Sequence, residues 1–451
     1  MTANHVPPDV AQRAQRARRV SPQQLADAMT RHEAFLARKP GATRANLSLV
    51  DLSQLDLSRR NLSGIDLSGA QLHRALLVHT VLRAANLFGA DLRQSNLTGA
   101  DLSRADLRGA CLRGAILDDA ILVQADLRNG SLATATTSGE LKSVRYDTLP
   151  SDLICVVMRR ADLSDARLGG ALIVQTDLSD ANLSRARLAG ADLRNAVLTG
   201  AVLDGADLSG CDLGGANLQG ASLTGCLWTG ARLDGTDLRG AVIDPAAFGM
   251  ADFSATQRNR AQRLTAEALA SHLAQHRDWI ESNGTKGQQL KLAEASLLGH
   301  ALAGATLPAA ELDFAEMTSL DLTGATLLMA SLVSADLRGA TLTEADLRGC
   351  RLRRGLLANA NLRKARLGPV TARGGQRWTS DLEAIKASGA DFAGADLTGA
   401  RLAYADLRQC RFDGAILVDA DLSHASLEGA VLTDAVLTNC RLTGTRGLNR
   451  R

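Results

Sequence analysis

Aromatic residues are scarce in this chain: they account for 3% of its 451 residues, whereas hydrophobic residues as a class account for 45%. Aromatic rings supply much of the buried area in ordinary globular cores. A globular core of this size would normally contain more of them, while a narrow interior filled by Leu and Ala has no room for rings. The composition therefore indicates a narrow core.

Strong charge and long apolar runs are missing as well. The formal net charge is +3, so the chain as a whole gives no electrostatic reason to bind nucleic acid or a membrane. No stretch approaches the ~18 apolar residues of a membrane span, and the amino terminus lacks the apolar centre of a signal peptide. We expect a soluble, cytoplasmic protein without a direct nucleic-acid or membrane partner.

Motifs of common active sites are also absent. The sequence contains no Walker-type Gly-Lys-Ser/Thr, no GxSxG and no HExxH. Its seven cysteines form no CxxC pair, so a zinc site is not expected. We predict no enzyme activity, no catalytic residues, no metal and no cofactor.

A leucine recurs at every fifth position from Leu47 to Leu132. Ala usually stands two residues before it, and Asp or Asn one residue before it. On a helix this period would spiral around the axis, and on a straight strand it would alternate between faces. A bend in every repeat solves the problem, because Ala and Leu then point inward while Gly and small polar residues turn the chain. Such bends predict a solenoid.

The repeats resemble those of the pentapeptide-repeat family, as seen in Ala90–Gln94 (Ala-Asp-Leu-Arg-Gln) and Ala105–Gly109 (Ala-Asp-Leu-Arg-Gly). The resemblance covers about two-thirds of the chain. It implies an all-β solenoid, specifically a right-handed quadrilateral β-helix with four repeats in each coil. Bacterial members of the family that confer fluoroquinolone resistance bind DNA gyrase by mimicking DNA.

The chain is predicted to be an internal duplication. Each half starts with a helical segment, which carries Phe35 and Leu36 in the first copy and Trp279 and Ile280 in the second. We expect these cap helices to cover open ends of the solenoid. The predicted parts are a disordered basic arm (1–20), a helical cap (21–44), a first solenoid (45–254) with an insertion (134–160), a helical linker or second cap (255–291), and a second solenoid (292–446) with an insertion (368–389).

Both insertions are predicted to be short helices. Ser151-Asp152-Leu153 and Ser380-Asp381-Leu382 each precede the next clear repeat by ten residues. Ser151 and Ser380 are candidate helix caps, and Gly389 is a candidate helix end.

Cysteine and aspartate have structural explanations within the repeat. Five cysteines replace the inward-facing Ala, which predicts buried, unreactive thiols: Cys211, Cys226, Cys350, Cys410 and Cys440. The recurring Asp and Asn suit hydrogen bonds to the turn backbone rather than catalysis. Trp228 falls in the leucine position and is expected to fill the interior of one coil.

Apolar residues at outward-facing positions are the main indication of binding. Two explanations remain open: they are covered by the chain's own insertion, or they form a docking face for a partner. The candidate protein-binding residues are Leu76, Val78, Val81, Ile116, Ile121, Val123, Tyr146, Leu149, Trp378 and Leu382. The last coil has no visible cap, which predicts a homodimer through the carboxy-terminal coil.

Three functions remain open at this point. The preferred one is a non-enzymatic scaffold for protein partners. The second is a DNA-mimicking regulator of DNA gyrase or topoisomerase, although Arg often follows the repeat Asp and offsets its charge, as in Asp91/Arg93 and Asp336/Arg338. The third is a rigid spacer. A continuous acidic stripe would favour mimicry, and mixed charge with apolar patches would favour the scaffold.

Overall fold

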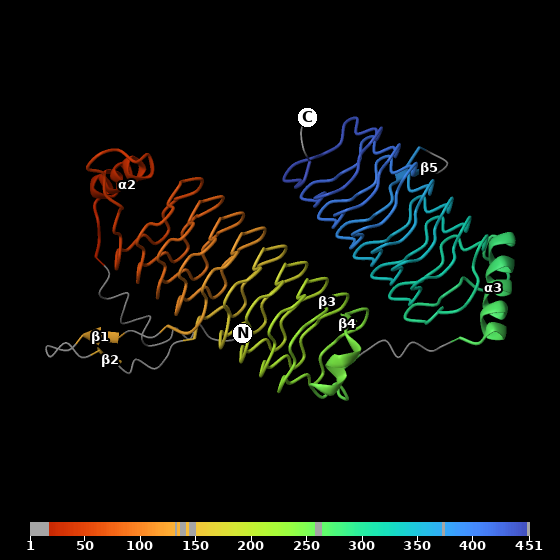
Figure 1. Ribbon diagram of the computed structural model, residues 1–451, viewed down its shortest axis with the longest axis horizontal. Helices are drawn as coiled ribbons and strands as arrows, with labels where there is room; N and C mark the ends of the chain where they lie inside the picture. Colours follow the sequence, from red (N-terminus) through yellow and green to blue (C-terminus); the bar gives the residue numbers. More distant parts are fainter. Residues whose placement is uncertain are drawn as a thin grey trace. The chain divides into compact units, whose positions relative to one another are not determined.

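The computed structural model describes residues 18–130, 133–135, 141–143, 150–257, 264–371 and 375–448. The chain forms two compact units, unit 1 (Met1–Gln257) and unit 2 (Arg258–Arg451). In each unit the backbone winds into a stack of coils (Figure 1). Most of the predicted arm and much of the first insertion lie outside the described residues.

Each repeat combines a short extended piece with a turn. In Ala90–Gln94 the side chains of Ala90 and Leu92 are buried, and Asp91 between them forms β-bridges to the neighbouring coils. The following turn ends at Gln94, whose φ is +56°. This left-handed conformation is strained for most residues but free for glycine, which explains why Gly so often fills the same position. The predicted bend is found in most of the described repeats.

Four repeats make one coil. Bridged residues lie twenty positions apart on parallel segments, as Asp66, Asn86 and Asp106 illustrate. The N–H of Leu72 donates to the carbonyl of Asp91 at 2.7 Å, and the N–H of Asp91 donates to the carbonyl of Ala70 at 2.9 Å. Every interior coil is therefore bonded to both of its neighbours in a β-helical stack. Leu and Ala fill its core, as the composition indicates.

Regular helices and strands are few among the described residues. The helices are α2 (Pro22–Leu36), the 3-10 helix η1 (Pro245–Gly249) and α3 (Ala266–Glu281). Three two-stranded pairs occur: β1 (Ala133–Ala135) antiparallel to β2 (Leu141–Ser143), β3 (Ser222–Leu223) parallel to β4 (Val242–Ile243), and β5 (Val370–Thr371) antiparallel to β6 (Arg377–Trp378). No helix in the described parts is long and apolar enough to cross a membrane.

The two α-helices cover the first coils of their units by equivalent contacts. In α2, His32 is fully buried and its Nδ1 accepts the N–H of Ala45 at 3.3 Å. In α3, His276 is fully buried and its Nδ1 accepts the N–H of Leu290 at 3.0 Å. Ser21 caps the amino-terminal end of α2 in a capping box, in which it exchanges hydrogen bonds with Gln24.

The predicted helical insertions are wrong. The first interruption contains the hairpin β1–β2, and the second contains the hairpin β5–β6. The repeats resume directly afterwards, since Asp152 bridges to Cys111 and Asp381 bridges to Arg351. Residues 152–160 and 381–389 therefore belong to coils of the solenoid. Gly389 is a turn residue with φ +73° rather than a helix end.

Ser151 and Ser380 join the interrupted coils instead of capping helices. Both occupy the inward Ala position and are fully buried. The Oγ of Ser151 accepts the N–H of Gly109 at 3.0 Å and donates to the carbonyl of Arg128 at 2.9 Å. Each serine thus connects the preceding coil to the point where the chain departs into its hairpin.

Replacing Ser380 by alanine is expected to destabilise unit 2 by ~1–2 kcal/mol, because a buried hydrogen-bond partner is lost. Its Oγ accepts the N–H of Gly349 at 3.0 Å and lies 3.1 Å from the carbonyl of Leu347, to which it donates. Urea denaturation followed by circular dichroism measures the change. Ser388→Ala, at a partly exposed turn, is the control, and equal stability of the two variants would contradict the assigned role.

Candidate interaction surfaces

Outward bridge residues determine the surface chemistry of unit 1, because the residues on either side of them point into the core. Many of these bridge residues are Asp or Asn. Two neighbouring ladders of bridges instead carry several aliphatic side chains. We call these seven residues the apolar face: Leu76, Ile116, Val157 and Val197 on one ladder, and Val81, Ile121 and Val202 on the next.

Four members of the apolar face are exposed despite being large and hydrophobic. Leu76, Ile116, Ile121 and Val197 each expose 36–43% of their surface, and the other three are half-buried. The ladders also include polar residues, with Asn96 between Leu76 and Ile116 on the first.

The remaining predicted binding residues are scattered. Val78 and Val123 lie half-buried in turns beside the apolar face. Trp378 is exposed in β6, in the other unit. Tyr146 and Leu149 lie outside the described residues.

The prediction that Leu382 forms part of a binding surface is wrong, because this residue is fully buried. Its segment resumes the repeat, which turns this leucine into the core. Among the cap-helix residues, Phe35 is exposed and lies 6.0 Å from His32, ring centre to ring centre. Leu36, Trp279 and Ile280 are half-buried.

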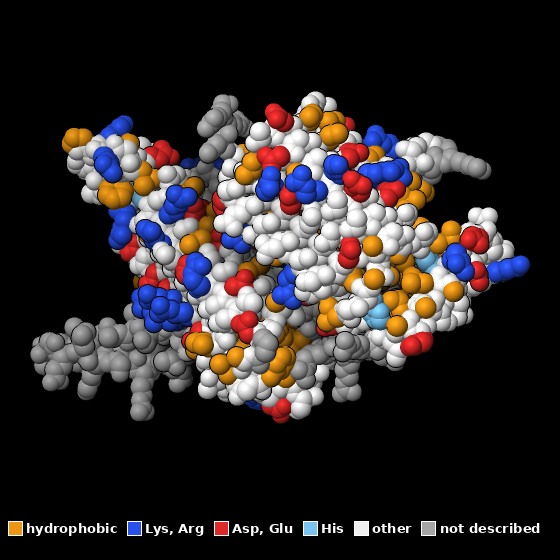
Figure 2. All heavy atoms as spheres, turned by 45° about the vertical axis from the view of Figure 1, so that its right-hand side comes forward, with side chains coloured by type: hydrophobic (Ala, Val, Ile, Leu, Met, Phe, Trp, Pro, Cys, Tyr) orange, Lys and Arg blue, Asp and Glu red, His pale blue; other side chains and the backbone are white. Residues whose placement is uncertain are grey.

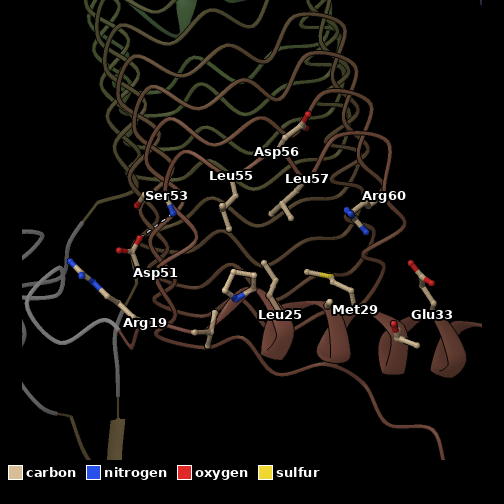
Figure 3. Close-up of a pocket in the computed structure, with 14 residues that line it drawn as sticks. Arg19, Leu25, Met29, Glu33, Asp51, Ser53, Leu55, Asp56, Leu57 and Arg60 are labelled. Atoms are coloured by element: carbon tan, nitrogen blue, oxygen red, sulfur yellow. Dashed lines mark hydrogen bonds between the residues drawn. The ribbon is translucent and has the colours of Figure 1, made fainter.

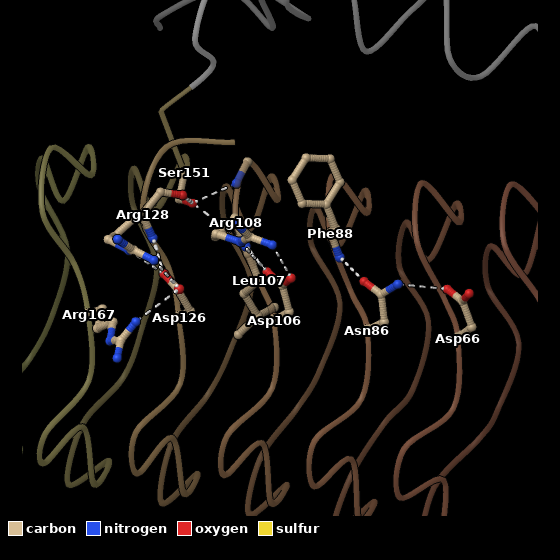
Figure 4. Close-up of polar contacts among 11 residues, drawn as sticks. Asp66, Asn86, Phe88, Asp106, Leu107, Arg108, Asp126, Arg128, Ser151 and Arg167 are labelled. Atoms are coloured by element: carbon tan, nitrogen blue, oxygen red, sulfur yellow. Dashed lines mark hydrogen bonds and ion pairs between the residues drawn. The ribbon is translucent and has the colours of Figure 1, made fainter. Parts of the chain in front are cut away.

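Arginine neutralises many of the outward carboxylates. Figure 4 shows one ladder, in which Asp106 binds Arg108 at 2.6 Å and Asp126 binds Arg128 at 2.7 Å. The same spacing of two residues pairs Asp192 with Arg194, whose hydrogen bonds lower the pKa of the Asp192 carboxyl. These carboxylates are paired with arginine, so they do not form a free acidic stripe.

The surface charge is accordingly mixed. On the face that Figure 2 shows, basic and acidic side chains are interspersed, with hydrophobic side chains between them. This distribution differs from the dense single-sign charge of a DNA backbone, which carries one negative charge per ~1.7 Å of duplex.

A groove separates α2 from the first coil of unit 1. It has a volume of about 570 Å³ and is lined by apolar residues from both sides, including Leu25 and Met29 of the helix and Leu55 and Leu57 of the coil. Figure 3 shows Leu25 and Met29 on the helix side of this groove and Leu55 and Leu57 on the coil side. The helix therefore covers the coil incompletely.

The carboxy-terminal end of unit 2 is less well covered than its interior. Leu432 and Leu437 are only half-buried, and Leu442 exposes 37% of its surface, although leucines in this position are buried within the stack. The cause is that no further coil follows among the described residues. Self-association through this end stays a prediction.

The buried thiols offer no nucleophile. Burial raises the pKa of four of the expected core cysteines to about 12: Cys211, Cys226, Cys350 and Cys410. Their inward placement is confirmed, and Cys440 is half-buried because it lies in the last coil. In the parts that the structure describes, no group of three His, Cys, Asp or Glu residues could hold a metal ion.

The sequence profile of pentapeptide repeats matches the chain in eight copies, at residues 45–83, 85–124, 176–215, 216–254, 315–354, 330–368, 380–414 and 415–446. These segments cover more than half of the chain. It belongs to the pentapeptide-repeat family. The comparison with curated proteins gives no match.

Solved pentapeptide-repeat proteins are similar to this one at low identity. HetL from Nostoc sp. strain PCC 7120, described as involved in heterocyst differentiation regulation, is 21% identical over 94% of this chain and 96% of its own, with a TM-score of 0.18. QnrB1, a plasmid-mediated fluoroquinolone resistance protein, is 18% identical over 47% of this chain and 94% of its own, with a TM-score of 0.29. A pentapeptide-repeat protein from Cyanothece 51142 is 24% identical over 36% of this chain and 90% of its own, with a TM-score of 0.20. TM-scores this low carry no information about partner or activity.

Sequence reasoning missed the groove beside α2. Its residue Leu55 stands in the Ala position of a repeat, where its size is unusual. That substitution was a visible signal, but its meaning depends on how the helix packs.

Proposed function

We propose that this pentapeptide-repeat protein is a non-enzymatic scaffold that binds a protein partner through the apolar face of unit 1. The observation that supports this most is the 36–43% exposure of Leu76, Ile116, Ile121 and Val197 at positions where Asp and Asn are common. Exposed apolar side chains that gather on one side of a molecule mark interaction sites.

The dimensions of the apolar face suit a protein surface. Leu76 and Val197 are separated by five bridge steps along one ladder, which is about 24 Å at a strand spacing of ~4.8 Å. Asn96 and Asp177 lie among the aliphatic residues on that ladder. A partner would therefore offer aliphatic contacts together with hydrogen-bonding groups, as in a mixed, non-obligate interface.

The arrangement of the coils beneath the apolar face would hold that face rigidly. Bridges at a spacing of twenty residues, in four ladders around each coil, favour a right-handed quadrilateral β-helix. The equivalent cap histidines and the equivalent serines at the two hairpins favour an internal duplication.

A DNA-mimicking regulator of gyrase is the alternative, and it rests on the family resemblance. Mimicry needs unpaired carboxylates in a dense row. In this chain Asp91, Asp126, Asp192 and Asp346, among others, are each paired with the Arg two residues later. The pairing favours the scaffold over the mimic.

Replacing Ile116 and Ile121 together by lysine is expected to reduce partner capture at least about tenfold, because two apolar contacts become charged. Tagged full-length protein would be incubated with lysate of its own cell, and bound proteins identified and quantified. Ile416→Lys is the matched control, since Ile416 is an exposed isoleucine at a bridge position of unit 2.

The outcomes separate the three functions. Loss of one partner with the double variant and its retention with Ile416→Lys support the scaffold. Capture of gyrase by all versions, with release by competing duplex DNA, would favour mimicry. Capture of no protein by any version would favour the spacer.

A further inference from the structure

Two neighbouring repeats of the first coil differ in how their inward positions are covered. Val50 and Leu55 occupy the same position of successive repeats, yet Val50 is 0% exposed and Leu55 is 37% exposed. One described contact distinguishes them: Arg18, which precedes α2, forms a bridge to Val50, whereas no described residue forms an equivalent bridge to Leu55 on that side.

That segment covers Val50 by forming a parallel bridge. The N–H of Arg18 donates to the carbonyl of Leu49 at 2.7 Å, and the N–H of Asp51 donates to the carbonyl of Arg18 at 3.1 Å. A single extended residue thus supplies the bonds that a preceding coil would make. The edge of the first coil can accept an added strand.

One repeat further on, the same backbone groups are open. The equivalents of the Leu49 carbonyl and the Asp51 N–H are the carbonyl of Gln54 and the N–H of Asp56. In the next coil of this ladder the N–H of Leu76 donates to the carbonyl of Leu55 at 2.9 Å. No such bond reaches the N–H of Asp56 from the described residues, and both Gln54 and Asp56 are exposed.

The open edge borders the groove beside α2. Leu25 and Met29 form one wall, and Leu55 and Leu57 form the other, around a volume of about 570 Å³ (Figure 3). Leu55 is exposed and Leu25 is half-buried, whereas Met29 and Leu57, which also line this space, are buried. Unpaired backbone groups next to an apolar hollow are the two elements of recognition by strand addition.

Acidic side chains outnumber basic side chains around the groove. Glu33, Asp51 and Asp56 line it together with Arg19 and Arg60. Hydrogen bonds from the Ser58 side chain and backbone lower the pKa of the Asp56 carboxyl, which is therefore ionised at neutral pH. Three carboxylates against two guanidinium groups favour a ligand with a basic residue beside its apolar one.

We propose that this groove binds an extended peptide segment of a partner protein, which adds a parallel strand beside Leu55. Its central residue is aliphatic and lies against Leu25, Met29, Leu55 and Leu57, and a Lys or Arg next to it faces the carboxylates. The backbone of that segment bonds to Gln54 and Asp56. Asp56 is bridged to Leu76 of the apolar face, but the proposal does not depend on a partner at that face.

The test uses a fluorescein-labelled peptide, acetyl-Thr-Lys-Val-Lys-Thr-amide, and full-length protein in a fluorescence anisotropy titration. Thr and Val favour the extended form. Methylation of the valine nitrogen removes the N–H that would bond to Gln54, and it is expected to weaken binding at least about tenfold. This arm leaves the protein unchanged, so its result does not depend on the folding of a variant.

The protein variant Leu55→Arg is expected to weaken binding of the unmodified peptide at least about tenfold, because the side chain fills the hollow and adds positive charge. Leu227→Arg is the matched control, since Leu227 is an exposed leucine of unit 1 that belongs neither to the groove nor to the apolar face, and it is expected to bind the peptide as the unchanged protein does.

Three results would overturn the proposal. One is equal affinity for the methylated peptide or for Leu55→Arg. Another is the lack of saturable binding up to about 1 mM for peptides with Val, Leu or Phe at the centre. The third is a concentration-dependent dimer that Leu55→Arg abolishes, which would make a second copy of the chain the occupant.

Discussion

Replacing Trp228 by alanine is expected to lower the free energy of unfolding of unit 1 by ~3–5 kcal/mol, the usual cost of truncating a buried aromatic side chain. Trp228 is fully buried in a position that leucine normally occupies. Its ring lies 5.4 Å from that of Phe253 in an edge-to-face contact. Chemical denaturation followed by far-UV circular dichroism would show a shifted transition.

The control for this prediction is Trp228→Phe. The indole Nε1 is buried and has no hydrogen-bond partner among the described residues, so phenylalanine removes an unsatisfied donor while it keeps a ring. It is expected to cost clearly less than alanine. Coils contact mainly their neighbours, and a transition assigned to unit 2 should therefore stay unchanged. Equal losses for Ala and Phe would contradict the assigned packing.

Acidification is expected to destabilise both cap helices, beginning near pH 6.5. Burial lowers the pKa of His32 and of His276 below the ordinary value of about 6.5 for histidine. The unfolded chain therefore binds more protons than the folded chain as the pH falls below 6.5. Stability decreases by up to ~1.4 kcal/mol per pH unit for each histidine until the folded pKa is reached.

The structural reason is that protonation makes both ring nitrogens donors. Nδ1 of His32 could no longer accept the N–H of Ala45, and Nδ1 of His276 could no longer accept that of Leu290. Denaturation midpoints measured from pH 7.5 to 5 test this. Asp192 contributes at lower pH, because its hydrogen bonds to Arg194 lower a carboxyl pKa that is already acidic.

The double variant His32→Asn/His276→Asn provides the control, since an amide oxygen can accept the same N–H without titrating in this range. We expect it to be less stable at pH 7.5, because the contacts of His32 with Phe35 and of His276 with Trp279 are lost. Its stability should change little between pH 7.5 and 5. A slope like that of the unchanged protein would disprove the histidine explanation.

The repeat was predictable because each position has one physical task. Leu and Ala at inward positions, an outward Asp or Asn, and a left-handed turn residue follow from the period of five alone, as Ala90–Gln94 shows. The helix cap at Ser21 was also predictable, since the capping box is local. The inward placement of Cys211 and Trp228 followed from their positions in the repeat.

The insertions were misjudged because Ser-Asp-Leu fits two structures. Ser151 reads as a helix cap, but it also fits the small inward position of a repeat. Leu153 lies two repeats before Leu163, and this phase was the signal that the coil had already resumed. The local capping preference of Ser151 favours a helix, whereas stacking on the neighbouring coil favours a repeat. In the structure, stacking outweighs capping.

The groove beside α2 could not be predicted in the same way. Its shape depends on where the helix lies over the coil and on where the segment before Pro22 stops pairing. Both depend on contacts between residues far apart in sequence, such as Arg18 with Val50. The size of Leu55 in an Ala position was the one local indication.

The two hairpins have a consequence for how such a chain can change over time. Ladder partners across them are 41 and 30 residues apart, in Cys111–Asp152 and Arg351–Asp381, yet the stacking register on both sides is kept. A serine closes each gap by bonding to the coil behind it. Segments of very different length can therefore be inserted in place of these two hairpins, in evolution or by design. The coils on either side would keep their stacking register.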